Sequence, residues 1–140
     1  METELIIVMV FLLVLSIEDI MWKEVHVIIL LVFLLSGCVY FGIVRQVATE
    51  EFIGGMMVGG TVFLISVCGN DLGSADGITL AATGAFLGLR MNLALVMISA
   101  FLAGIGAAVK KILFKGKDRN TLPLIPFIAA GEAILIRVKL

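Results

Sequence analysis

Residues 5–20 of the chain read LIIVMVFLLVLSIEDI, an apolar run that is interrupted only near its end by Glu18 and Asp19. Further apolar runs follow, separated by short polar breaks, at residues 25–44, 52–68, 75–89, 93–114 and 122–138. A helix needs about 20 mostly apolar residues to cross the hydrocarbon core of a bilayer. The pattern therefore predicts an all-α, polytopic integral membrane protein with about six transmembrane helices.

The composition of the whole chain favours the same fold class. Of the 140 residues, 61% are hydrophobic and 15% are charged, and the mean hydropathy is +1.21. A soluble domain of this length carries far more charged surface. No long linker separates the apolar runs, so we expect a single transmembrane domain over residues 1–140.

The charged and metal-binding residues exclude several classes of partner. A formal net charge of −1 gives no basic surface for nucleic acid. His26 is the only histidine, and Cys38 and Cys68 form no CxxC motif, so we expect neither a metal nor another cofactor. The expected surroundings are the lipid bilayer.

The loop at residues 110–119 predicts the orientation, because it carries five basic residues and one acid. The positive-inside rule places such a loop in the cytoplasm. Counting back through the runs then places the N-terminus outside. The same count puts Asp19, at the end of the first run, and Asp76, at the start of the fourth, at similar depth on the cytoplasmic side.

Two such carboxylates suggest catalysis. Charged groups inside a membrane are costly and by default indicate function. When two carboxylates share a water-poor site, one can act as a base on water while the other, protonated, polarises a peptide carbonyl. The structural alternative is that both are solvated at an interface, or that Asp76 favourably occupies the first turn of a helix.

Three segments resemble the type IV prepilin peptidases, a family that includes the archaeal preflagellin peptidases. Residues 16–20 read SIEDI, close to the S-x-x-D-[IL] that ends the family's first helix. Residues 73–76 read GSAD where the family has GxGD, and Ile78 stands where lysine is frequent. Residues 122–131 read LPLIPFIAAG and are similar to the family's P-F-x-P-F-L-A-x-G segment.

The resemblance implies a membrane-embedded aspartic endopeptidase of the short, peptidase-only form, with Asp19 and Asp76 as the catalytic pair. It implies a multi-pass protein of the bacterial or archaeal plasma membrane that serves type IV pilus assembly or protein secretion. Its substrates would be prepilin-like precursors (pilins, pseudopilins or archaellins) that lose a basic leader at the cytoplasmic face. Glu18, Gly73 and Asp71 are candidate substrate-binding residues.

Two other functions stay open at this point. A small ion-coupled carrier would place Glu132, in the last run, on one path with the two aspartates. A catalytically silent homologue in a membrane assembly would be consistent with the altered GxGD motif. The glycine pairs at residues 54–55 and 59–60 predict close helix packing, with a groove for a substrate helix as the alternative.

Overall fold

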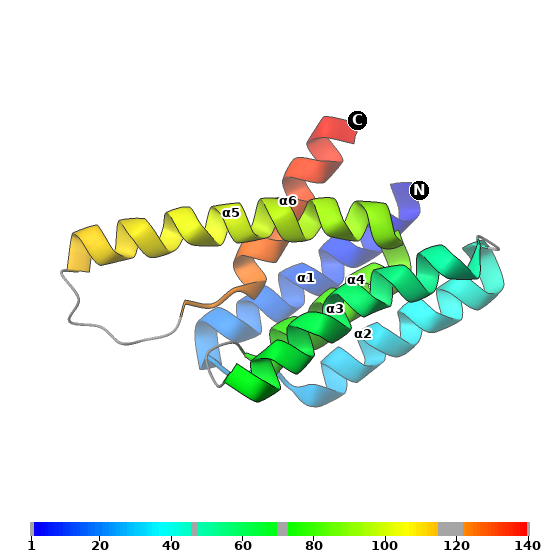
Figure 1. Cartoon of the computed structure of the whole chain (residues 1–140), viewed down its shortest axis with the longest axis horizontal. Helices are drawn as coiled ribbons and strands as arrows, with labels where there is room; N and C mark the ends of the chain where they lie inside the picture. The colour runs from blue at the N-terminus through cyan, green and yellow to red at the C-terminus, as the bar shows by residue number, and fades with distance from the viewer. Residues whose placement is uncertain (1, 46–47, 70–72, 115–121, 140) are drawn as a thin grey trace.

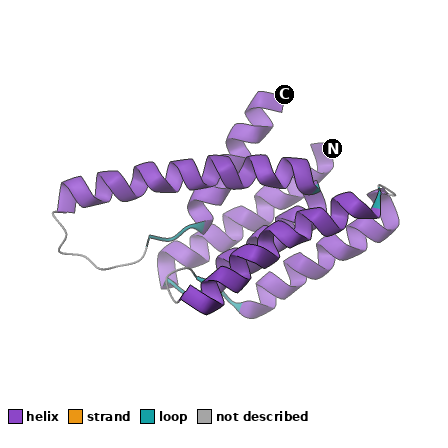
Figure 2. Ribbon diagram, in the orientation of Figure 1, coloured by secondary structure: helices purple, strands orange, loops and turns teal. Residues whose placement is uncertain are grey.

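The computed structural model describes residues 2–45, 48–69, 73–114 and 122–139, and every regular element in these ranges is helical (Figure 2). The elements in chain order are α1 (Glu2–Trp22), α2 (Val27–Tyr40), the π-helical η1 (Phe41–Arg45), α3 (Thr49–Gly69), α4 (Ser74–Leu87), α5 (Leu89–Phe114) and α6 (Ile125–Lys139). The predicted all-α fold class is therefore confirmed. Each of the six predicted apolar runs corresponds to one α-helix.

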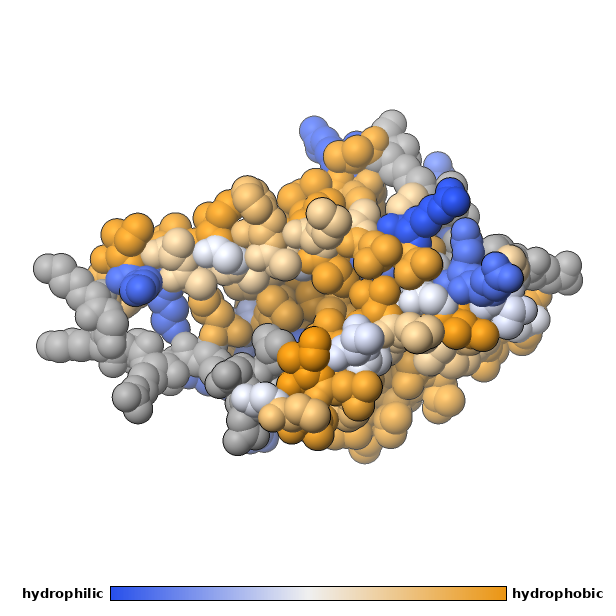
Figure 3. All heavy atoms as spheres, in the orientation of Figure 1, coloured by the Kyte–Doolittle hydropathy of each residue, from blue (hydrophilic) through white to orange (hydrophobic). Residues whose placement is uncertain are grey.

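The surface is that of a membrane protein. Four stretches are long and apolar enough to cross a membrane, namely α1, residues 27–44 of α2 and η1, α3, and α5. Large apolar side chains such as Ile28, Met97 and Phe101 point outward from these helices. Figure 3 shows an apolar surface that lies between two ends where hydrophilic residues gather. The chain is thus embedded in a bilayer, with apolar residues both inside the bundle and facing lipid.

Two helices are short, as their apolar runs in the sequence are. α4 has 14 residues and α6 has 15, which is roughly 21–23 Å at 1.5 Å per residue. The hydrophobic core of a bilayer is about 30 Å thick. The turn between the fourth and fifth runs lies at Gly88, where φ is 79°. Glycine adopts this conformation without steric cost, so α4 ends just before it and α5 begins just after it. The polar residues at 90–92, which the sequence pattern placed between the two runs, belong to α5 instead.

The short helix α4 forms the centre of the bundle. Ten of its 14 residues are buried, and α1, α2, α3 and α5 all pack against it. Glycines of α3 make the closest approach: a Cβ atom at Gly59 would overlap the backbone of Ala81, and Gly55 lies directly against Gly84. Close packing, which small residues permit between membrane helices, thus explains one glycine of each pair in α3.

One buried side chain ties three helices together at this centre. Asn92 of α5 is 0% exposed. Its Nδ2 donates hydrogen bonds to the carbonyl oxygens of Gly55 in α3 (2.9 Å) and Leu80 in α4 (3.0 Å). Its Oδ1 accepts a hydrogen bond of 2.9 Å from the Thr83 hydroxyl. Because these side chains are buried, their hydrogen bonds to the protein replace the ones that water would otherwise make.

Successive helices run back and forth along the bundle (Figure 1). As a result, the end of α1 and the starts of α4 and α6 reach the same end of the molecule. α1 packs against both α4 and α6. This arrangement brings together residues that are far apart in the sequence.

Candidate active site

Asp19 lies in the last turn of α1, and a backbone group of α6 holds its side chain. The carboxylate accepts a hydrogen bond from the backbone N–H of Ile125, the first residue of α6. The first N–H groups of a helix have no partner within that helix, so this donor is available. The other oxygen of Asp19, Oδ2, is buried and has no hydrogen-bond partner among the described residues.

Asp76 lies in the first turn of α4 and is 9% exposed. Gly73 is the N-cap of this helix, and the Asp76 carboxylate accepts a hydrogen bond from its backbone. A carboxylate at this position commonly reaches back to the N-cap N–H group. A Cβ atom at position 73 would lie 3.2 Å from Oδ2 of Asp76. Glycine therefore lets the carboxylate lie tightly against the loop.

The two aspartates lie at the same end of the bundle, one in the last turn of α1 and the other in the first turn of α4. Their carboxylates are close enough for the charge of Asp19 to act on Asp76. Two carboxylates in such a site hold a shared proton more easily than two negative charges. The pair can then supply both a base for water and an acid for a carbonyl oxygen.

Glu18 occupies a different position from its neighbour Asp19. Its Oε1 lies 3.2 Å from Nδ1 of His26, and its Oε2 is 3.4 Å from the backbone nitrogen of His26, which donates to it. His26 is the N-cap of α2. Glu18 thus supports the turn between α1 and α2, a local contact that the sequence does not reveal. Asp71, the other acidic candidate, lies outside the described residues.

Glu132 is fully buried in α6. It is seven residues after Ile125, which places it about 10 Å further along the helix axis. The structure therefore separates it from the end of the bundle where the aspartates meet. Among the described residues, no three side chains of histidine, cysteine, aspartate or glutamate gather to hold a metal ion.

A comparison with protein families identifies the class to which the chain belongs. The family model for type IV leader peptidases matches residues 6–108. The chain belongs to the type IV leader peptidase family. The match includes Asp19, Gly73 and Asp76. It confirms the family resemblance and covers the first two of its three segments, whereas residues 122–131 lie outside it. No curated protein and no solved structure matched the chain.

Membership in the leader peptidase family gives the chain a leader-peptidase-like role in the membrane. The helix α6, which supplies the N–H group to Asp19, lies beyond the matched residues. The segment at 122–131 stands out in the sequence, but the backbone N–H group of Ile125 does not, because every residue type except proline carries such a donor. The prolines at 123 and 126 are the one signal that a chain turn and a helix start fall there.

Proposed function

We propose that the chain is a membrane-embedded aspartic endopeptidase that removes the basic leader from type IV prepilin-like precursors. Asp19 and Asp76 form the catalytic pair. The observation that carries the proposal is that the ends of two helices inside the family-matched region bring the two carboxylates within electrostatic range of each other. The altered motif supports it as well, since Gly73 keeps the backbone contact to Asp76 although Ala75 replaces the second glycine.

The chemistry follows from one proton shared by two carboxylates. The ionised carboxylate removes a proton from a water molecule, and the oxygen of that water attacks the carbonyl carbon of the scissile peptide bond. The protonated carboxylate donates to the carbonyl oxygen as negative charge develops there. Collapse of the tetrahedral intermediate breaks the C–N bond, and the leaving nitrogen takes up a proton from the pair.

The position of the pair suits a bond between a leader and a membrane helix. Asp19 lies near the end of α1, which is long and apolar enough to cross a membrane, and Asp76 lies at the start of α4. We therefore place the pair near the boundary of the bilayer. A precursor with a hydrophobic helix would present the start of that helix at this depth. The positive-inside rule applied to the basic residues at 110–119 puts this end in the cytoplasm. The proposed location is the plasma membrane of a bacterium or archaeon, in type IV pilus assembly or protein secretion.

The test is cleavage of a prepilin-like precursor in membranes that contain wild type, Asp19→Asn or Asp76→Asn. We expect wild type to release the leader and both variants to lose this activity. Glu50→Gln is the matched control, because Glu50 is an exposed acid at the start of α3, away from the pair. Cleavage that survives both aspartate substitutions would contradict the proposal and favour the ion-coupled carrier. Failure of wild type to cleave would favour the silent homologue.

A further inference from the structure

A groove lies between α1 and α6 on the lipid-facing side of the bundle. Its volume is about 290 Å³. A cavity of about 150 Å³ is enough to hold benzene, so the groove has room for roughly two large side chains. The residues that form its walls are Met9, Leu13 and Ser16 on α1, and Pro126, Ala129, Ala130 and Ala133 on α6.

Both walls of this α1–α6 groove lead to Asp19. On α1, Ser16 is the last lining residue, and Asp19 follows it by three positions, or about one helical turn. On α6, Pro126 directly follows Ile125, whose N–H group binds the Asp19 carboxylate. On both walls, the groove therefore ends within about one helical turn of Asp19 or of the residue that contacts it.

We infer that the α1–α6 groove receives the hydrophobic helix of the substrate and presents the bond that precedes this helix to Asp19. The inference rests on the proposed function and adds the route by which the precursor reaches the aspartates. The start of the substrate helix would lie beside Asp19, and the rest would run along α1 towards Met9. Lateral entry of this kind needs no opening of the buried centre around α4.

The side chains of the groove fit a helix. Its lining residues on α6 include Pro126, Ala130 and Ala133, which are spaced like one face of a helix. Small residues let a second helix approach closely in a membrane, where packing drives association. The walls carry no charged side chain, so the matching occupant is apolar. Ala130 and Ala133 are exposed and free to contact such a partner.

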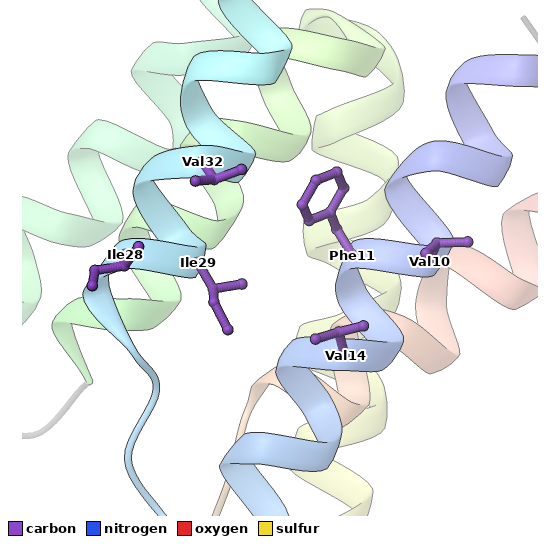
Figure 4. Close-up of a pocket in the computed structure, with 6 residues that line it drawn as sticks. All are labelled: Val10, Phe11, Val14, Ile28, Ile29 and Val32. Atoms are coloured by element: carbon purple, nitrogen blue, oxygen red, sulfur yellow. The ribbon is translucent and has the colours of Figure 1, made fainter.

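A second apolar groove, between α1 and α2, does not lead to the aspartates. It has a similar volume of about 320 Å³, and Figure 4 shows Phe11 and Val14 of α1 facing α2 across it. Its lining on α1 ends at Val14. The residue one turn further along is Glu18, whose carboxylate contacts His26. This groove serves as an internal control.

The experiment places a photoreactive amino acid at Ala130, at Val14 or at Ala107, in a chain that also carries Asp76→Asn. Ala107 is an exposed residue of α5 and lines neither groove. Each protein is reconstituted in lipid vesicles with a radiolabelled prepilin-like precursor and illuminated. We expect a covalent adduct with the precursor from Ala130, several-fold stronger than from the other two positions. Equal or stronger adducts from Val14 or Ala107 would overturn the inference, as would adducts at Ala130 only with lipid or with a second copy of the chain.

A cleavage assay separates this inference from the proposed function. Ala130→Phe should fill the groove and lower the cleavage rate by roughly tenfold, because the added ring takes the space that the side chains of the substrate helix would occupy. Ala107→Phe should cleave at the wild-type rate. If wild type cleaves and Ala130→Phe cleaves equally fast, the groove assignment is wrong while the proposed function stands. If wild type does not cleave, the proposed function fails, and the adduct pattern still decides where the helix binds.

Discussion

The carboxylate of Asp19 accepts a hydrogen bond from the backbone N–H of Ile125, so the first residue of α6 holds a residue in the last turn of α1. The contact joins two segments more than 100 residues apart in the chain. It makes α6 part of the candidate active site although the helix lies beyond the family-matched residues.

Removal of this N–H group should impair catalysis. Ile125→Pro lacks the donor, and proline is tolerated as the first residue of a helix. A hydrogen bond to a charged group contributes about 1.5–3 kcal/mol, so we expect cleavage to fall roughly tenfold or more. Ile125→Ala keeps the N–H group while it removes most of the buried side chain, and it should retain more activity than the proline variant. Equal activity of the two variants would contradict the positioning role.

The glycines of α3 provide a matched pair for the packing of α4. Gly59→Ala should destabilise the protein by roughly 1–3 kcal/mol, because the added methyl group meets the backbone of Ala81. Gly60→Ala meets no described atom within 4 Å, and alanine is the better helix former by roughly 0.5–1 kcal/mol. Unfolding in mixed detergent micelles measures both variants. A stable Gly59→Ala protein would show that α3 and α4 do not pack this closely.

The network at Asn92 should contribute measurably to stability. Asn92→Leu removes its three hydrogen bonds and leaves the hydroxyl of Thr83 with fewer partners. Hydrogen bonds between membrane helices average about 0.6 kcal/mol each, so we expect a total loss of roughly 1–2 kcal/mol. Thr61→Val is the control, because Thr61 is exposed and its hydroxyl donates only within its own helix. Unfolding in mixed detergent micelles measures both variants. An Asn92→Leu protein with the same midpoint of unfolding as wild type would contradict this role.

Glu18 should matter little for catalysis if its role is to support the α1–α2 turn. The amide of Glu18→Gln can still accept the N–H group of His26. A partly exposed side-chain contact of this kind contributes about 0–1 kcal/mol. We therefore expect cleavage to change less than about fivefold. If the Glu18→Gln protein is folded and its cleavage rate falls by more than this, Glu18 would instead bind the basic leader.

The sequence predicted the features that depend on apolar runs and isolated charges. Six runs became six helices, and Asp19 and Asp76 stood out because carboxylates seldom interrupt such runs. Alternating helix direction then places the two aspartates at one end of the bundle. These inferences use only helix length and the cost of charge in lipid, which are properties of residue type.

Hydropathy was a poor guide to the interior. Polar residues such as Thr79 and Thr83 lower the hydropathy of α4, yet most of this helix is buried. In a bilayer the exterior is as apolar as the core, so burial no longer follows hydrophobicity. For the same reason Asn92 resembles a loop residue in the sequence, whereas it is a buried link between helices. The hydrogen bond from Ile125 to Asp19 could not be predicted from residue types, because its donor is a backbone N–H group.

The most direct test of the central claim compares single-turnover cleavage by Asp19→Asn, Asp76→Asn and the double variant in proteoliposomes. Catalytic groups that act as a unit are strongly non-additive, so that losing one costs nearly as much as losing both. We predict that each single variant falls to the background rate and that the double variant is no slower. Substantial residual cleavage in either single variant, with a further multiplicative loss in the double variant, would contradict a shared catalytic pair.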